Sequence, residues 1–315
     1  MIDQYHRNIN KLRISVTEAC NLGCVYCVES PTVHRVNPQQ LSSLQILKLV
    51  QLLVHHAGIE TIRITGGEPL LFNNLPELIE GIAQLPVTSI GLTTSGQQLA
   101  SKAKILKQRG LSRVNVSIDS VDPDTFKKLT RTGHLEKTID GIHAALDAGL
   151  KVKLNTVVMR GENDGELLNL LAFALNLKVE IRFLELMQMG PLYQYDCSKF
   201  VSMNEMLTNI RQRYSFVSDQ GESDDTAVYY KTPMGRFGVI ANESAPFCNR
   251  CSRLRLASDG TLFGCLSHPL GVPIRHLLTA ETPEPLVMAA VQEAISVKRT
   301  VHFTGSRLRM SQIGG

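Results

Sequence analysis

Hydrophobic residues recur along the first two thirds of the chain with two alternating periods, one typical of strands and one typical of helices. Short β-branched, apolar runs predict six strands, at residues 12–16, 61–65, 89–94, 114–119, 152–158 and 180–186. Between them, three segments carry apolar residues on one helical face, and these segments are residues 41–58, 136–149 and 164–177.

Strands that alternate with helices in this way pair in parallel, because each helix carries the chain back across the sheet. Six such units are fewer than the eight of a closed barrel. We therefore predict an α/β fold with an open, partial (β/α)6 barrel of the TIM type. A flat, doubly wound sheet would show the same alternation and remains the alternative.

The pattern changes after Gly190, which predicts a barrel at residues 1–191 and a smaller C-terminal region at residues 192–315. Residues 219–225 are acidic and polar, as in an exposed loop. Two hairpins are predicted after it, one turning near residues 233–235 and the other at residues 259–260. We expect this region to pack over the mouth of the barrel.

Composition excludes little: 43% of the residues are hydrophobic, 20% are charged, and the formal net charge is +4. Lys and Arg form no runs, which argues against nucleic acid and leaves an anionic small substrate as the better match. No apolar stretch reaches the roughly 18 residues that span a membrane. Residues 1–10 are polar and do not resemble a signal peptide. The expected location is therefore the cytoplasm, with no membrane partner.

Six of the seven cysteines fall into two tight groups, whereas Cys197 stands alone. Cysteines in the cytoplasm are kept reduced, so close grouping indicates metal binding rather than disulfides. We call Cys20, Cys24 and Cys27 the first cysteine group. The second cysteine group consists of Cys248, Cys251 and Cys265.

The first cysteine group directly follows the strand predicted at residues 12–16. Parallel-sheet enzymes carry their chemistry on loops at the carboxyl ends of strands, so a reactive centre is expected here. Three thiolates can hold three irons of a [4Fe–4S] cluster and leave the fourth iron open. Zinc is the alternative, but it usually takes four ligands, and the nearest histidine in sequence is His34.

The second cysteine group also offers three thiolates, on either side of a predicted turn. Zinc is a stronger alternative here, because structural zinc sites often use a CxxC pair and a remote residue could complete the set. Arg253 and Arg255 follow Cys251, and strand alternation places both on one face. They point either toward whatever the cluster binds or, on the alternative interpretation, into solvent.

A third motif, TGGEP at residues 65–69, follows the second predicted strand. Its glycines allow the backbone to approach a ligand closely. Either Glu68 or the neighbouring carbonyls could accept hydrogen bonds from a cationic amine.

The CxxxCxxC loop, with Tyr26 before its last cysteine, resembles the signature of the radical S-adenosylmethionine (SAM) superfamily. TGGEP, one βα unit later, resembles the GGEP motif of the same superfamily. The resemblance implies that the open iron chelates the amino and carboxylate groups of SAM. An electron from the cluster then cleaves SAM, and the 5′-deoxyadenosyl radical removes a hydrogen atom from the substrate.

Further motifs narrow the resemblance to the GTP 3′,8-cyclases, which begin molybdenum-cofactor synthesis. They are LRISVT at 12–17, SIDS at 117–120, KLNT at 153–156, MRG at 159–161, IRF at 181–183, FCNRCSRLRL at 247–256 and MSQIGG at 310–315. Their order and spacing agree over nearly the whole chain. The resemblance implies a second [4Fe–4S] cluster on the second cysteine group, which binds the guanine of GTP through its open iron. The radical removes the ribose 3′ hydrogen, and the sugar radical then closes onto guanine C8.

The resemblance also assigns individual residues. It implies contacts with SAM at Tyr26, Gly67, Ser117 and Met187. It implies contacts with GTP at Arg13, Arg63, Thr93, Lys153, Arg253 and Arg255, to which we add Arg182. Catalytic roles fall to Arg253, Arg255 and the terminal Gly314 and Gly315, which reach into the active site in this family. Several converging arginines suit a triphosphate, because each guanidinium can bind two of its oxygens at once.

The sequence departs from the family pattern at Val28 and Glu29, where Met-Pro is usual. It also departs at Thr61, where the family often has Lys, at Phe72, where it often has Arg, and at Ser95, where it usually has Asn. Loss of two cations leaves a divergent radical SAM enzyme, acting on another nucleotide or a peptide, as the alternative function. A zinc-stabilised binding module is the non-enzymatic alternative. The expected partners are GTP, a reducing electron donor and the cyclic pyranopterin monophosphate synthase that acts next. Whether the chain forms a homodimer stays open.

Overall fold

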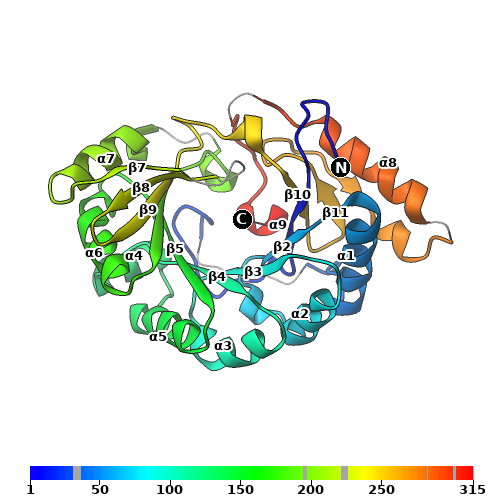
Figure 1. The fold of residues 1–315 in the computed structure, drawn as a ribbon, viewed down its shortest axis with the longest axis horizontal. Coiled ribbons are helices and arrows are strands. Elements are labelled where there is room, and N and C mark those ends of the chain that lie inside the picture. Colours follow the sequence, from blue (N-terminus) through cyan, green and yellow to red (C-terminus); the bar gives the residue numbers. More distant parts are fainter. Residues whose placement is uncertain (31–36, 194–196, 221–225, 282, 301–302, 315) are drawn as a thin grey trace.

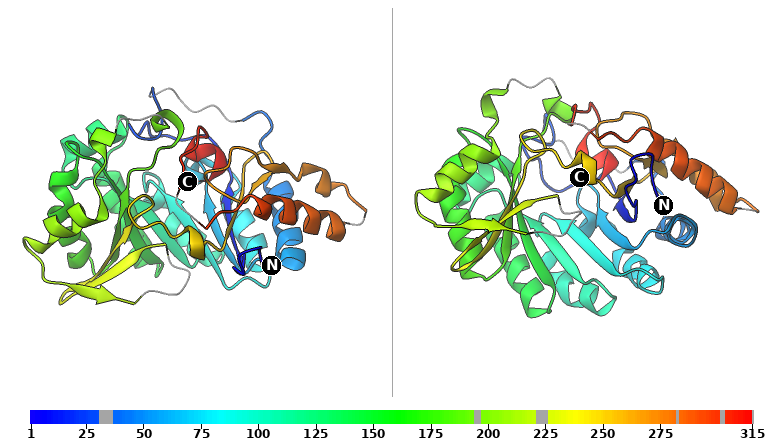
Figure 2. Two further views of the ribbon diagram at one scale, coloured as in Figure 1. Left: turned by 90° about the horizontal axis from the view of Figure 1, so that it is seen from above. Right: turned by 45° about the horizontal axis from the view of Figure 1, so that its top comes forward.

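The computed structural model describes residues 1–30, 37–193, 197–220, 226–281, 283–300 and 303–314. Within these residues, twelve strands form one sheet in the order β12-β11-β10-β1-β2-β3-β4-β5-β6-β9-β8-β7. The sheet curves around a central lumen, and the helices other than α9 cover its outer face (Figure 1). Both further views show the same open curve (Figure 2), so the predicted partial barrel is confirmed over a flat sheet.

The strands are β1 (Lys11–Ser15), β2 (Thr61–Thr65), β3 (Ser89–Thr94), β4 (Arg113–Ser117), β5 (Lys151–Val158), β6 (Glu180–Glu185), β7 (Val217–Asp219), β8 (Val228–Thr232), β9 (Gly235–Ile240), β10 (Arg253–Leu256), β11 (Thr261–Phe263) and β12 (Val272–Pro273). The helices are α1 (Ser43–Ala57), α2 (Leu75–Ala83), α3 (Leu99–Gln108), α4 (Pro123–Thr130), α5 (Leu135–Asp147), α6 (Leu167–Asn176), α7 (Met203–Arg211), α8 (Pro283–Ser296) and α9 (Met310–Ile313). β1 to β6 are the six predicted strands, shifted by a residue or two at most.

The C-terminal region differs from the expectation that it would pack over the barrel mouth. β9 pairs in parallel with β6, and β10 pairs in parallel with β1, so this region extends the sheet at both edges. The predicted hairpins are confirmed as β8–β9 and β10–β11. Of the predicted acidic loop at residues 219–225, only the first residue, Asp219, belongs to a strand, the end of β7, and residues 221–225 lie outside the described part of the chain.

Helix boundaries follow from local capping chemistry. α1 begins after Ser42, which forms a capping box with Gln45, and it ends at Gly58 in the left-handed conformation, with φ of 68°. The third predicted helix begins later than expected, because residues 164–166 form a 3-10 turn and α6 starts at Leu167.

Strand alternation separates an apolar face from a polar one. In β2, Ile62 and Ile64 are fully buried in the main hydrophobic core. Arg63 and Thr65 alternate with them along the strand and therefore point to the opposite face of the sheet, into the lumen. The core thus lies between the sheet and its outer helices, and the lumen receives polar side chains.

The last described residues run back into this lumen, where α9 lies inside the curve of the sheet (Figure 1). The hydroxyl of Ser15 donates to the carbonyl oxygen of Ser311 at 2.9 Å, which ties α9 to the end of β1. A second apolar cluster surrounds this segment and contains Met189, Ala257, Phe263, Phe303 and Ile313. In the described residues, no helix is both long and apolar enough to cross a bilayer.

Helix α8 packs directly on the backbone at Gly264, where a β-carbon would overlap the carbonyl oxygen of Ala294. Gly264→Ala is therefore expected to reduce the free energy of unfolding by at least about 1–3 kcal/mol through overpacking. Gly165 is the matched control, because a β-carbon there would meet no atom within 4 Å. Gly165→Ala should stay within about 0.5 kcal/mol of the parent chain. Urea unfolding followed by circular dichroism measures both, and equal stability of the two variants would contradict this packing.

Candidate active site

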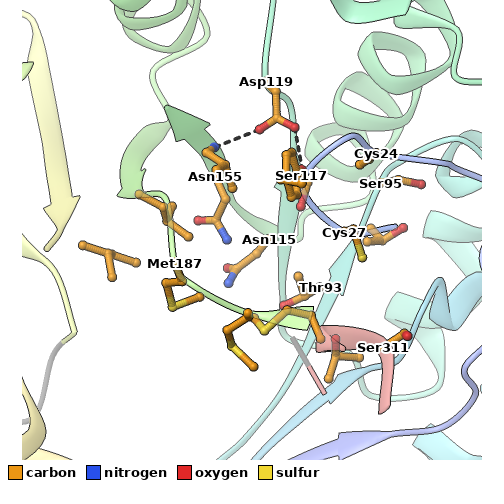
Figure 3. A pocket seen from close by; sticks show the side chains of 18 of the residues that line it. Cys24, Cys27, Thr93, Ser95, Asn115, Ser117, Asp119, Asn155, Met187 and Ser311 are labelled. Atoms are coloured by element: carbon orange, nitrogen blue, oxygen red, sulfur yellow. Dashed lines mark hydrogen bonds between the residues drawn. The ribbon is translucent and has the colours of Figure 1, made fainter. Parts of the chain in front are cut away.

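The lumen contains a cavity of about 290 Å³ that is bordered by the carboxyl ends of β2 to β6. Figure 3 shows side chains from separate strands and loops that point into it. Most residues assigned from the sequence line this cavity: Arg13, Cys20, Cys24, Tyr26, Cys27, Gly67, Thr93, Ser117, Arg182, Met187, Arg253 and Arg255. A smaller pocket adjoins it and is lined by Cys248, Cys251 and Cys265, and Phe247, Arg253 and Arg255 border both cavities.

Two backbone segments join to form one wall of the main cavity. The amide of Gly67 donates to the carbonyl of Thr17 at 2.7 Å, and the amide of Glu68 donates to that of Ala19 at 2.8 Å. A β-carbon at Gly67 would lie 2.5 Å from the carbonyl oxygen of Glu18. This glycine therefore allows the TGGEP turn to contact the backbone that leads into the first cysteine group, rather than only a ligand.

Glu68 is 1% exposed, and its carboxylate already accepts four hydrogen bonds. Thr94 Oγ1 donates at 2.6 Å, the amide and hydroxyl of Ser95 each donate at 2.7 Å, and the amide of Leu70 donates at 3.0 Å. Of the two acceptors considered for a cationic amine, the backbone carbonyls are therefore the better candidates. Ser95, a departure from the family pattern, fixes the Glu68 side chain.

Tyr26 is held against the end of the fourth strand. Its hydroxyl donates to Asp119 Oδ2 at 2.6 Å, and the amide of Val157 donates to Asp119 Oδ1 at 2.8 Å. Burial raises the pKa of Asp119 to about 6, although both hydrogen bonds act to lower it. The loop of the first cysteine group is thus anchored to β4 and β5 (Figure 3).

The thiols of the first cysteine group are largely neutral as they stand. Burial raises the pKa of Cys20 to about 12 and also raises the pKa of Cys24 and Cys27. Iron binds thiolate, so a cluster would displace these protons on binding. In the described residues, no three His, Cys, Asp or Glu side chains enclose a single metal ion. A [4Fe–4S] cluster binds its three thiolates through three different irons, and three cysteines per group fit that requirement.

Lys298 and Arg7 support the second cysteine group. Burial acts to raise the pKa of Cys251, but the ammonium of Lys298 and the guanidinium of Arg253 lower it to about 6. Arg7 forms an ion pair with Asp3 at 2.6 Å and donates to the carbonyl of Cys248. Burial raises the pKa of Cys248.

Five guanidinium groups face one another in the lumen, and we call them the arginine group: Arg13, Arg63, Arg182, Arg253 and Arg255. Burial lowers the pKa of Arg13 well below its usual value, and the other four arginines lower it further. Among the described residues, Arg13 Nε, Arg182 Nη2 and Thr93 Oγ1 are buried without a hydrogen-bond partner. Buried polar atoms are rarely left unpaired, so this region is suited to an anion with several acceptor oxygens.

Two of the predicted substrate residues lie outside the cavity lining. Arg63 donates to the carbonyl of Leu92 at 3.3 Å, and burial lowers its pKa to about 9, with Arg113 and Arg182 adding to the effect. Lys153 forms an ion pair with Glu180 at 2.7 Å. Both residues alternate with core residues of their strands and so belong to the lumen face of the sheet.

The C-terminal tail is held by Arg255, one member of the arginine group. Arg255 is 7% exposed and donates to the carbonyl of Ile313 at 3.4 Å and to the carbonyl of Gly314. Gly314 adopts φ of 74°, and a β-carbon there would lie 3.1 Å from Thr65 Cγ2. Gly315 and the side chain of Cys197 lie outside the described residues.

Sequence reasoning missed several residues of this site. Asn115 and Asn155 line the cavity. Each stands two residues from a predicted site residue, Ser117 in β4 and Lys153 in β5, and residues two apart on a strand share a face, so this spacing could have revealed them. Lys298 had no such signal, because it stands alone after a helix.

Comparisons with known proteins agree with this geometry. Residues 14–174 match the family model "Radical SAM superfamily", and residues 179–304 match "Molybdenum Cofactor Synthesis C". A protein of Synechocystis sp. named "GTP 3′,8-cyclase" is 38% identical over 316 aligned residues, which cover 100% of this chain and 95% of the relative. The chain belongs to the GTP 3′,8-cyclase family. Another member, from Pelotomaculum thermopropionicum, is 37% identical, with 100% of both chains covered.

As a member of this family, the chain is a radical SAM enzyme, which implies a [4Fe–4S] cluster and SAM. A solved structure supports the fold of this cyclase-family chain. Streptococcus suis SuiB bound to S-adenosylmethionine matches with a TM-score of 0.62 and 15% identity, covering 89% of this chain and 68% of SuiB.

The backbone contact at Gly67 generates a prediction. Gly67→Ala should displace the first cysteine group, because its β-carbon would collide with the carbonyl oxygens of Glu18 and Ala19. After anaerobic reconstitution, iron content should fall, because the first cysteine group would no longer hold its cluster, and SAM binding in equilibrium dialysis should be lost. Gly81→Ala is the control, since its β-carbon would meet only the flexible end of Leu47. Unchanged iron and SAM binding in Gly67→Ala would refute this role of the glycine.

Proposed function

We propose that this chain converts GTP to (8S)-3′,8-cyclo-7,8-dihydroguanosine 5′-triphosphate, the first step of molybdenum-cofactor synthesis. The observation that carries the proposal is the arginine group with its unpaired buried donors, situated between two groups of three cysteines. A nucleoside triphosphate is a ligand that supplies many charge-assisted acceptors at once. Family membership at 37–38% identity over the full chain supports the same activity.

The first cysteine group would hold one [4Fe–4S] cluster, with SAM on its open iron. When bound, this cluster supplies the electron that cleaves SAM to a 5′-deoxyadenosyl radical. Tyr26, Gly67, Ser117 and Met187 would contact SAM, and all four line the main cavity. Asp119 would position Tyr26 through their 2.6 Å hydrogen bond.

The second cysteine group would hold a second [4Fe–4S] cluster, which would offer an open iron to the guanine. Its three cysteines share a pocket with Arg253 and Arg255. Such a site keeps one end of GTP near the second cysteine group and directs the phosphates into the lumen. The ribose then lies on the side of the cavity that faces the first cysteine group.

The arginine group would bind the triphosphate. Arg13, Arg182, Arg253 and Arg255 line the main cavity together with Thr93. Arg63 and Lys153 would contribute positive charge from outside the cavity lining, and Lys153 would do so while paired with Glu180. Anion binding relieves the repulsion among these guanidinium groups, so substrate affinity and local stability should rise together.

The two departures that remove a cation, Thr61 and Phe72, lie away from the main cavity. Phe72 is packed in the main hydrophobic core, and Thr61 pairs with Lys11 at the start of the strands. Neither residue lines the main cavity. A divergent substrate therefore has no specific support from these positions.

Gly314 and Gly315 would complete the active site from the C-terminal side, with Arg255 holding the tail. The reaction further needs an external reducing electron donor, and the product would pass to the cyclic pyranopterin monophosphate synthase. A homodimer is compatible with this scheme but carries no part of it.

A deuterium transfer experiment tests the reaction. The reconstituted chain is incubated anaerobically with SAM, a strong reductant and GTP deuterated at C3′, and mass spectrometry then follows the products. We expect a cyclised product and deuterium in 5′-deoxyadenosine, because the radical removes the 3′ hydrogen. GTP deuterated at C8 is the control and should transfer none. Deoxyadenosine without deuterium, and no cyclised GTP, would contradict the proposed function.

Variants in the same assay separate the two halves of the site. Replacing Cys20, Cys24 or Cys27 by Ala should abolish deoxyadenosine release. Replacing a residue of the second cysteine group, or deleting Gly314 and Gly315, should abolish cyclised product while deoxyadenosine release continues without coupling. Full cyclisation by the tail deletion would remove the tail from the proposal.

A further inference from the structure

Lys298 is a buried lysine that the proposed function leaves without a role. It lies two residues after the end of α8 and is 3% exposed. Its ammonium donates to Cys251 Sγ at 3.4 Å, to the carbonyl of Arg253 at 2.9 Å and to the carbonyl of Gly264 at 2.9 Å. An ammonium has three protons to donate, so its hydrogen-bonding capacity is fully used.

These contacts connect Lys298 to every part of the second cysteine group. One acceptor is Cys251 itself, and another, Gly264, directly precedes Cys265. The carbonyl of the next residue, Arg299, accepts from Arg7 at 2.8 Å, and Arg7 also donates to the carbonyl of Cys248. Because α8 packs on Gly264 without space for a β-carbon, the helix fixes where Lys298 enters the site.

The charge of Lys298 needs a counter-charge. A buried ammonium is costly unless it is paired, and carbonyl dipoles compensate it only in part. Among the described residues, Lys298 forms no ion pair with a carboxylate, and sulfur of Cys251 is its nearest anionic partner once that thiol is deprotonated. Three thiolates leave a [4Fe–4S] cluster with net negative charge, and reduction by one electron makes that charge larger.

We propose that Lys298 is the buried counter-charge of the second cluster, and that its hydrogen bond to Cys251 raises the reduction potential of that cluster. The inference rests on the proposed function, in which the second cysteine group holds a [4Fe–4S] cluster. Reduction adds one electron from the titrant and breaks no bond, so the fixed ammonium stabilises the reduced form more than the oxidised form. Lys298 is thus a positioning residue that acts through Cys251.

A redox titration tests this role without an activity assay. The full chain with Cys20, Cys24 and Cys27 replaced by Ala carries only the second cluster, whose midpoint potential is read by electron paramagnetic resonance. Lys298→Met removes the charge at similar length, and Lys298→Arg keeps it. Lys48→Met is the control, because Lys48 also donates to a carbonyl, that of Leu278 at 2.6 Å, but lines neither cavity.

In Lys298→Met, the ratio of reduced to oxidised cluster at a fixed potential should fall at least tenfold, a midpoint shift of 59 mV to more negative values. Lys298→Arg and Lys48→Met should stay close to the parent. An unchanged midpoint in Lys298→Met overturns the inference, as does an equal shift in Lys298→Arg, which would indicate packing rather than charge.

If Lys298→Met loads too little iron to titrate, the iron content of the two Lys298 variants is compared instead. Retention of the cluster by Lys298→Arg then supports the charge role, and its loss from both variants overturns it. A different result would contradict the proposed function instead: the triple-Ala parent loads no cluster, and the wild-type chain loads only one. The two failures are therefore distinguishable.

Discussion

Electrostatic repulsion inside the lumen is the constraint on which the rest of this site depends. Arg13 is half-buried, and burial, followed by the charges of four other guanidinium groups, lowers its pKa. Burying an unpaired ion costs several kcal/mol even after local relaxation. The fold sustains that cost through the hydrophobic core between the sheet and its outer helices. A polyanion removes part of the cost, so the same group that strains the free chain provides affinity for a triphosphate.

Sheet register determines where that anion can lie. β10 pairs with β1 so that Arg255 is level with Arg13 and Arg253 with Lys11. Cys251 comes just before β10, whereas the first cysteine group follows β1. Since the two strands are parallel, the arginines lie between the two cysteine groups along the strand direction. A ligand that contacts both cysteine groups must therefore pass the arginine group, and GTP has its phosphates and its base at opposite ends.

Local patterns in the sequence predicted the six barrel strands, both hairpins and the two cysteine groups, because each depends on residues close in the chain. Resemblance to the family added residues such as Ser117 and Met187, which do line the cavity. The edge pairing of β9 and β10 was not predicted, because parallel pairing between distant strands has no local signal. Lys298 and the Ser95–Glu68 contact were missed for the same reason, since both depend on contacts between remote segments.

The most direct test of this account compares the affinities of GTP, GDP and guanosine for the reconstituted, anaerobic chain by calorimetry. If the arginine group binds the triphosphate, affinity should fall at each loss of phosphate, with about 1.5–3 kcal/mol for each charge-assisted hydrogen bond that is removed. Part of the fall should persist at high salt, because partly buried charges are screened less than exposed ones. Equal affinities for GTP and guanosine would contradict the account, because the lumen would then not be a triphosphate site.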